Sequence, residues 1–292
     1  MPVEYVDSIP LALRAEIEEL PTLPSIVTAC LDEIHNPQSN AQRVADLMLA
    51  DVGLTARALR LVNSSFYALS SEVQSLSQAI ALLGTARLEE IILSVVLPQL
   101  FAKGEGGHLV RRIWEHSFAT AFIARELAVR LGFPRPANAY VAALMHDLGL
   151  IVAARCLPVP LRRVVDENGR LGHWDLTVES RELQTDHTVV GASLGRKWDF
   201  PDGIIDTIRD HHSPSGGNPM VGLVHVADRC AGAGGLGVLE REEDASFDLL
   251  THCQETPGLA DALAIPSDLK CLDIPADWVD QVRALVAEFM GP

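Results

Sequence analysis

The sequence predicts an all-α protein. Aromatic residues make up only 5% of its 292 residues, whereas alanine and leucine abound, and this composition is typical of helices. Apolar residues recur with helical spacing in one segment after another, and between residues 20 and 102 no segment reads convincingly as a strand. With 48% hydrophobic and 21% charged residues, the chain can fold as one large domain or two medium ones.

The composition also narrows the class of function. A net charge of −16 argues against a generic nucleic-acid or anionic-membrane surface, because both partners need clustered lysine and arginine. Residues 1–7 carry two acids and no basic group, so we expect no signal peptide, and the apolar run Ile91–Pro98 is too short to span a bilayer. The five cysteines are scattered without a C-x-x-C pair. Reduced thiols in the cytoplasm fit this pattern best, and a thiolate zinc site is not expected.

The front of the chain is expected to form a leader followed by short helices. Residues 1–19 are the leader, and Leu20-Pro-Thr-Leu-Pro24 is a turn that starts a new unit over 20–102. Ser75 and Gln78 form a capping-box sequence at the start of one of these helices. The expected helices of this part are 25–34, 41–49, 54–62, 78–83 and 85–101, with breaks at 36–40 and 51–53.

A glycine-rich joint at residues 103–107 leads into a second helical part over 108–232, where the histidines become dense. The stretch Ala142–Leu150 is central to this part, because it reads as an apolar helix that carries the adjacent His146 and Asp147. Residues 233–292 are expected to form an acidic tail with one helix near 277–290. The expected helices of the second part are 109–131, 137–154, 158–167, 177–185, 187–198, 202–212 and 220–233.

Several of these helices contribute a histidine or an aspartate at one end or on an apolar face. Burying an imidazole beside a carboxylate is costly unless each has a partner, and a metal ion is one such partner. Taken singly, each group has an ordinary explanation as a hydrogen-bonded core histidine, a surface acid or a solvated helix end. Together they exceed what core packing needs, and imidazole and carboxylate from several directions suit a divalent ion. The candidate ligands are His116, His146, Asp147, His187, His211, His212 and Asp228.

The order His, His-Asp, His, His-His, Asp resembles the HD metal-dependent phosphohydrolase superfamily. More closely, residues 20–232 resemble the HDOD (HD-related output domain) family. The motifs that carry the resemblance are Leu20-Pro-Thr-Leu-Pro24, Leu54-Thr-Ala-Arg-Ala-Leu-Arg-Leu-Val-Asn-Ser64 with Phe66-Tyr67, Ala79-Ile-Ala-Leu-Leu-Gly84, Glu182, His187, Gly191-Ala192 and Trp198-Asp-Phe-Pro201. The resemblance implies an all-helical fold, with a front helical bundle joined to an HD-type helical bundle, in a bacterial regulatory protein that serves as an output or adaptor module.

The HD superfamily also implies roles for the candidate ligands, although many HDOD members have lost them. Asp147 would bridge two divalent transition-metal ions, with Fe or Mn the first choice by analogy and Zn or Ni as alternatives. The resemblance assigns one ion to His116, His146 and Asp228, and the other to His187, His211 and His212. If the protein is an enzyme, a water activated between the two cations would attack a phosphoester.

Departures from the active branch of the superfamily argue against hydrolysis of cyclic di-GMP by the usual route. Leu150 stands where a lysine near the scissile phosphate is common, and Arg112 stands where some members offer a glutamate for a third ion. The loop 213–219 lacks a Gly-Tyr-Pro sequence.

Arg111 and Arg112 are candidates for binding an anionic ligand, with a surface pair as the alternative.

Two functions therefore stay open, and a third is weaker. The first is a signalling module whose metal site binds a phosphorylated small molecule or a protein partner. The second is an active metal-dependent phosphohydrolase on a nucleotide or cyclic nucleotide, and the third is a plain scaffold. Leu150 favours the first over the second, and the complete ligand set favours either over the third.

Arg57, Arg60 and Asn63 are a weaker candidate pocket for a phosphate or a partner carboxylate, with arginines in solvent or in salt bridges as the alternative.

Overall fold

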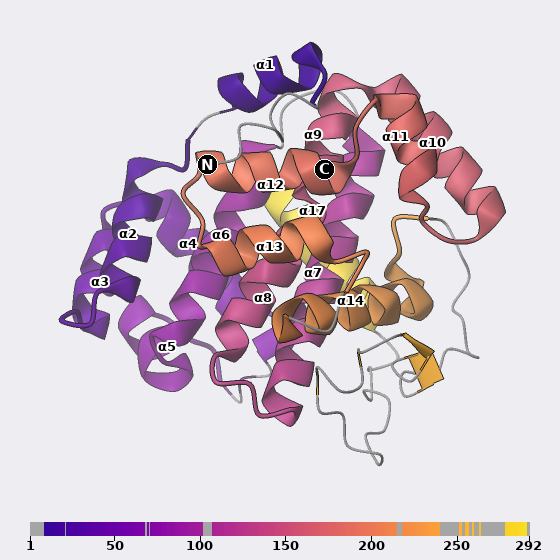
Figure 1. The fold of residues 1–292 in the computed structure, drawn as a ribbon. Coiled ribbons are helices and arrows are strands. Elements are labelled where there is room, and N and C mark those ends of the chain that lie inside the picture. Colours follow the sequence, from indigo (N-terminus) through magenta and orange to yellow (C-terminus); the bar gives the residue numbers. More distant parts are fainter. Residues whose placement is uncertain are drawn as a thin grey trace. The chain divides into compact units, whose positions relative to one another are not determined.

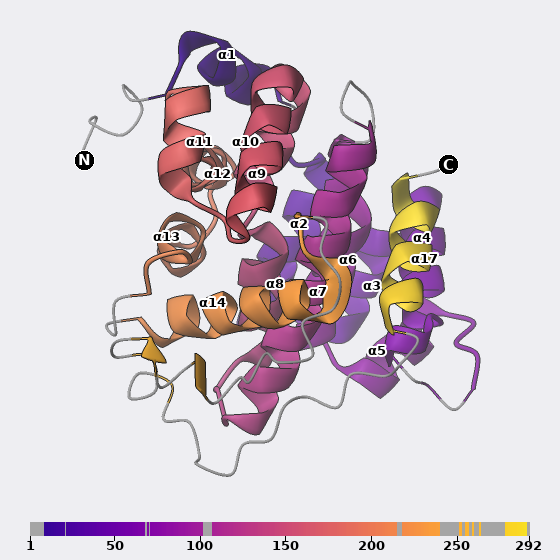
Figure 2. The same ribbon diagram turned by 90° about the vertical axis from the view of Figure 1, so that its right-hand side faces the viewer.

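The computed structural model describes a helical protein (Figures 1 and 2). Its described residues are 9–20, 22–67, 69, 71–101, 107–214, 218–239 and 278–290, with six positions between 251 and 263. Within these ranges no residue lies in a strand, which confirms the all-α prediction. The chain divides into two compact units, Met1–Leu20 with Gly104–Val279 and Pro21–Lys103 with Asp280–Pro292. Residues 103–106 of the predicted joint and most of the predicted tail lie outside the described residues, whereas Gly107 already begins a helix.

The unit built on Pro21–Lys103 is a bundle of mostly short helices. They are α2 (Ser25–His35), α3 (Ala41–Leu49), α4 (Val52–Val62), α5 (Leu76–Leu83) and α6 (Ala86–Leu100), with a 3-10 turn at Ser65–Tyr67, and α17 (Trp278–Met290) belongs to the unit for most of its length. Helix α6 packs against α2, α4 and α5, and every residue from Ile91 to Pro98 is buried. The apolar run in this helix therefore forms core.

Side-chain caps set the starts of α3, α4 and α5 in this unit. Helix α4 begins two residues before the predicted start, because the Asp51 carboxylate accepts a hydrogen bond from the Leu54 N–H at 2.9 Å and makes Asp51 the N-cap. The predicted break between these helices is present, but it lies at Ala50 and Asp51, and Val52 and Gly53 already belong to α4. At α5, Ser75 Oγ accepts from the Gln78 N–H at 3.2 Å, as predicted, but Gln78 Oε1 accepts from the Gln74 N–H and not from that of Ser75.

The unit that holds the histidines is built around a long helix. Its elements are α1 (Leu11–Glu19), α7 (Gly107–Arg130), α8 (Pro136–Met145), α9 (Leu148–Cys156), α10 (Pro158–Leu171), α11 (Leu176–Leu183), α12 (His187–Lys197), α13 (Asp202–Asp210), α14 (Pro219–Ala231) and the π-helical turn η3 (Gly232–Leu236). Helix α7 packs against α8 and α14, while α12 packs against α9 and lies beside α13, as Figure 1 shows. Lys197 ties α1 to α12, since its ammonium donates to the carbonyls of Ile17 and Leu20.

The predicted helix over 137–154 is in fact two helices. Helix α8 ends at Met145 and α9 begins at Leu148, so that His146 and Asp147 form the turn between them. Asp147 has φ −99° and ψ 16°, outside the helical region. Apolar residues continue on both sides of the turn, so the sequence pattern carries no sign of the change in helix axis. The prediction of one continuous helix was wrong at the point where the candidate ligands lie.

The stretch Pro136–Cys156 is long and apolar enough to cross a membrane. However, 89% of its most apolar 18-residue segment is buried inside the protein. It comprises α8 and α9, and every residue from Ala139 to Ala154 is buried. Its hydrophobic character is therefore that of a core element. Among the described residues no other stretch meets the same test.

Two glycines allow α9 and α12 to touch. A Cβ placed on Gly149 would lie 2.0 Å from the His187 carbonyl oxygen and 2.8 Å from the Gly191 nitrogen. A Cβ on Gly191 would lie 3.1 Å from the Gly149 nitrogen, and it would also lie 2.8 Å from Ile208 Cγ2 of α13. The backbone of α9 thus rests directly on the first turn of α12, and this contact places Asp147 beside His187.

We expect Gly149→Ala to destabilise the protein by about 2–3 kcal/mol, because its methyl group would force α9 away from α12. The change in free energy of unfolding is measured by urea denaturation. Gly169→Ala is the matched control: this helical glycine of α10 has no atom within 4 Å of an added Cβ, so the substitution should be neutral or slightly stabilising. Equal effects of the two substitutions would contradict the proposed role of the α9–α12 contact.

Candidate metal centre

The structure brings all seven predicted ligand residues together inside one unit. They come from helix ends, helix faces and the turn between two helices. His116 lies on α7, His146 and Asp147 lie in the turn between α8 and α9, His187 begins α12, His211 and His212 follow α13, and Asp228 lies on α14. Five of the seven are buried, and His212 and Asp228 are partly exposed. Residues that are more than a hundred positions apart in the sequence therefore share one cluster.

The carboxylate of Asp147 is the centre of this cluster. Its Oδ1 lies 3.3 Å from His187 Nε2 and 3.6 Å from His211 Nε2. Its Oδ2 lies 3.3 Å from His146 Nε2 and 3.6 Å from His116 Nε2. The two oxygens thus face two separate groups of imidazoles.

The two remaining predicted ligands extend these groups. His212 Nε2 lies 3.1 Å from His187 Nε2, on the Oδ1 side of Asp147. Asp228 Oδ1 lies 3.1 Å from His116 Nε2, on the Oδ2 side. Two sets of possible ligand atoms, Asp147 with His187, His211 and His212, and Asp147 with His116 and His146, each lie within 4.8 Å of one another. The carboxylate of Asp147 belongs to both sets.

Four of the imidazoles are oriented by hydrogen bonds at Nδ1. The Nδ1 atoms of His116, His146 and His211 lie 2.8, 2.7 and 2.9 Å from the carbonyl oxygens of Leu236, Ala143 and Ile208, respectively. A carbonyl oxygen can only accept, so these Nδ1 atoms carry the proton. The lone pair of each neutral ring is then on Nε2, which faces Asp147. Outer hydrogen bonds of this kind are the usual support of histidine ligands in metal sites.

Glu179 supports the fourth imidazole and was missed by the sequence analysis. This fully buried carboxylate accepts from the His187 backbone N–H at 2.8 Å and lies 2.7 Å from His187 Nδ1. It also accepts from Trp174 Nε1 at 3.1 Å. Glu179 lies on α11, a short helix that the sequence marks only as acidic, and no local pattern separates it from the neighbouring Glu182. Only the packing of α11 against the start of α12 identifies it.

Residues of the cluster and their neighbours shift one another's pKa values. Burial alone would lower the pKa of His187, but the charge and hydrogen bond of Glu179 and the charge of Asp147 outweigh it and raise that pKa to about 9. Burial would raise the pKa of Asp147, yet the neighbouring His146, His211 and His187 hold it well below its ordinary value. Burial lowers the pKa of His211 and of His212. A pKa of about 9 leaves His187 protonated at neutral pH when no metal ion is bound, so a divalent cation that takes its Nε2 must displace that proton.

One unsatisfied atom tests whether a metal ion fits. His146 Nε2 is buried and has no hydrogen-bond partner among the described residues, although Asp147 Oδ2 is 3.3 Å away. The nitrogen and the carboxylate oxygen therefore need a cation between them, either a second proton on the ring or a metal ion. A metal ion bound to both atoms would satisfy them together. The donor set therefore fits a metal ion of the class that binds imidazole and carboxylate.

A cavity of about 430 Å³ opens onto the cluster. Its wall includes His116, Asp147, His212 and Asp228 from the candidate ligands, and also Leu150. Arg111 and Arg112 are not among the described residues that line it, and the Arg112 guanidinium donates to the Val238 carbonyl instead. Their predicted role in ligand binding stays a prediction.

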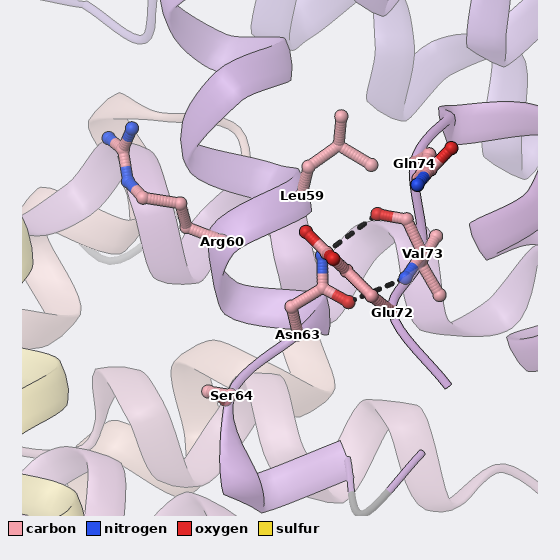
Figure 3. A pocket seen from close by; sticks show the side chains of 7 residues that line it. All are labelled: Leu59, Arg60, Asn63, Ser64, Glu72, Val73 and Gln74. Carbon is pink, nitrogen blue, oxygen red and sulfur yellow. Dashed lines mark hydrogen bonds between the residues drawn. The ribbon is translucent and has the colours of Figure 1, made fainter. Parts of the chain in front are cut away.

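The weaker candidate pocket of Arg57, Arg60 and Asn63 is not a single pocket in the structure. Arg57 lines a cavity of about 240 Å³ beside α2 and α6, whereas Arg60 and Asn63 line an open hollow of about 610 Å³. In that hollow, Figure 3 shows the Asn63 amide hydrogen-bonded to Val73, donating to the carbonyl at 2.8 Å and accepting from the N–H at 2.7 Å. Asn63 thus holds the loop before α5 in place.

Comparison with known proteins agrees with the fold. The family model of the HDOD domain matches residues 20–214, so the chain belongs to the HDOD family. The structure is similar to that of an HDOD domain protein with unknown function from Geobacter sulfurreducens, with 29% identity, a TM-score of 0.78, and coverage of 97% of this chain and 99% of that one. A protein of Shewanella amazonensis named "Putative phosphohydrolase" is 23% identical, with a TM-score of 0.69 and 97% of each chain covered; this likeness concerns the fold alone.

A longer relative is also similar. An uncharacterised protein of Treponema pallidum is 25% identical over 222 residues, which are 74% of this chain and 43% of the relative. The chain therefore spans less than half the length of that protein. Because that protein is uncharacterised, the similarity gives no information about activity.

We expect Glu179→Gln to lower the affinity of the cluster for a divalent ion by about 10- to 100-fold, because the amide no longer holds His187 as a carboxylate does. The affinity is measured by competition with a coloured chelator. Glu182→Gln is the control on the same helix, since that carboxylate pairs with Arg163 at 2.9 Å and makes no contact with His187. An unchanged affinity in Glu179→Gln would show that Glu179 does not support a metal ligand.

Proposed function

We propose that this chain is a bacterial cytoplasmic regulatory protein whose cluster binds two divalent transition-metal ions and, through them, a phosphorylated ligand. Membership of the HDOD family supports the regulatory role. The seven-residue cluster supports metal binding, with Asp147 as the bridging ligand. The partner that responds to the ligand would be a signalling protein, because a net charge of −16 does not suit a nucleic acid or an anionic membrane.

One observation carries this proposal. The two oxygens of buried Asp147 face two groups of imidazoles, whose Nε2 atoms lie around the carboxylate. Without a metal ion, protons on these rings must supply the positive charge that the buried carboxylate needs. The donor set of histidine and carboxylate suits Fe or Mn, as in the HD superfamily, and equally Zn or Ni.

The cavity supports a ligand with phosphate groups. At about 430 Å³ it falls within the range of ordinary small-molecule sites, roughly 300–1,000 Å³. When bound, the ions would supply positive charge for phosphate oxygens and lower the pKa of a bound water. Among the described residues that line the cavity, Arg229 is the one side chain with a permanent positive charge. It lies next to Asp228 on α14, where it can approach a phosphate near the cluster.

Hydrolysis of a phosphoester is the second candidate function. The cavity reaches both His116 and Asp147, so a ligand could meet the metal ions directly. Leu150 also lines the cavity, and this apolar side chain stands where the active branch of the superfamily offers a lysine. The absence of that cation favours binding over turnover, and it is the reason that hydrolysis is placed second.

Metal analysis tests the proposed centre. We expect about two transition-metal ions per chain in the purified, untagged protein, and loss of these ions in Asp147→Asn, because the amide cannot bridge two cations. The content is measured by elemental analysis after dialysis. Asp166→Asn, an exposed aspartate of α10, is the matched control and should keep the full content. Equal metal content in Asp147→Asn and in the unaltered protein would refute the proposal.

Turnover separates the two functions. We expect little or no hydrolysis of a generic phosphodiester such as bis-p-nitrophenyl phosphate with added Mn²⁺, because Leu150 supplies no charge to the phosphate. Leu150→Lys should introduce or raise the activity if the ions are in place. Rapid hydrolysis by the unaltered protein, abolished by Asp147→Asn, would instead establish the second function.

A further inference from the structure

Two further histidines meet at the wall of the same cavity. His225 lies on α14, three residues before Asp228, and His252 lies in a distant part of the chain. Their Nε2 atoms are 3.2 Å apart, and their rings are nearly parallel, with an interplanar angle of 22°. Both side chains are partly buried, and both line the cavity. Neither histidine belongs to the seven-residue cluster.

The orientation of His225 repeats that of the candidate ligands. Its Nδ1 lies 2.8 Å from the backbone carbonyl oxygen of His211, so Nδ1 carries the proton and the lone pair is on Nε2. This lone pair faces His252 Nε2.

The spacing of the two nitrogens matches that of two ligands on one ion. Nitrogens that are each about 2.0–2.1 Å from a tetrahedral ion lie roughly 3.3 Å apart. The corresponding distances within the candidate centre are 3.3 Å from His187 Nε2 to His211 Nε2 and 3.1 Å from His187 Nε2 to His212 Nε2. The value of 3.2 Å for His225 and His252 falls between them. A direct hydrogen bond between the rings is the alternative, and it requires His252 to carry its proton on Nε2.

We propose that His225 Nε2 and His252 Nε2 hold a further divalent metal ion, separate from the two ions assigned to the seven-residue cluster. The ion belongs to the class that prefers imidazole, such as Zn²⁺ or Ni²⁺. Among the described residues, no third histidine, cysteine or acidic group is close enough to complete the set. The remaining positions of the ion are open to water or to an oxygen of the ligand in the shared cavity. A phosphorylated ligand that spans the cavity would then contact this ion at one end and the candidate dinuclear centre at the other.

Zinc titration tests the site without reference to activity. The metal-free protein is titrated with Zn²⁺ by calorimetry, alone and as His252→Ala, and Asp147→Asn is titrated alone and combined with His252→Ala. We expect each His252→Ala protein to bind one zinc ion fewer than its parent. His173→Ala is the control, because His173 is an exposed histidine that lines the same cavity outside the pair. It should leave the count unchanged.

The comparison with Asp147→Asn keeps the two proposals apart. If the seven-residue cluster binds no metal, Asp147→Asn will match the unaltered protein, while the loss on His252→Ala will persist. If His252→Ala leaves the zinc count unchanged in both parents, the further site is refuted, whatever Asp147→Asn shows. Thermal melting by circular dichroism confirms that each variant is folded, and His252→Gln repeats the test with a smaller change in packing.

Discussion

The buried carboxylate of Asp147 is the group on which the rest of the site depends. It lies in the turn between α8 and α9, and its two oxygens face imidazoles that come from three other parts of the unit as well as from its own neighbour His146. A buried anion without a counter-charge is strongly unfavourable, so this group needs cationic partners. Protonated imidazoles or metal ions can supply that charge. The unsatisfied Nε2 of His146 and the lowered pKa of His211 are compatible with metal ions in this role, which is the basis of the proposed centre.

The packing of the surrounding helices places these imidazoles next to Asp147. The glycine contact between α9 and α12 brings His187 within reach, and the buried Glu179 fixes the orientation of its ring. The turn η3 contributes the Leu236 carbonyl that orients His116. The glycine contact, the Glu179 carboxylate and the Leu236 carbonyl all orient ligand residues. None of these three groups has to bind a metal ion itself. They explain why the site depends on packing at some distance from the carboxylate.

The residues of the cavity wall bear on whether a phosphate ligand would only bind or would also be hydrolysed. The candidate ligands are all present, whereas Leu150 puts an apolar side chain near them and Arg229 is the permanent cation in the described part of the wall. Binding of phosphate needs positive charge and space, and both are available when the ions are bound. Catalysis needs in addition a cation at the bond that breaks. The apolar Leu150 in this wall is the reason that we propose binding of a phosphorylated ligand ahead of its hydrolysis.

The sequence by itself determined the all-α class, the family, most helix ranges and the residue types of the cluster. These features are local or appear as ordered motifs: helical periodicity, break residues such as Gly84, and the His-Asp pair at 146–147. Only the tertiary structure decided that His146 and Asp147 form a turn, that Glu179 supports His187, and that His225 meets His252. An apolar pattern shows that a segment is buried but not where its axis changes, and a single acid or histidine carries no mark of the partner that packing will bring to it. Contacts between distant segments depend on how whole helices pack, and no local pattern encodes that.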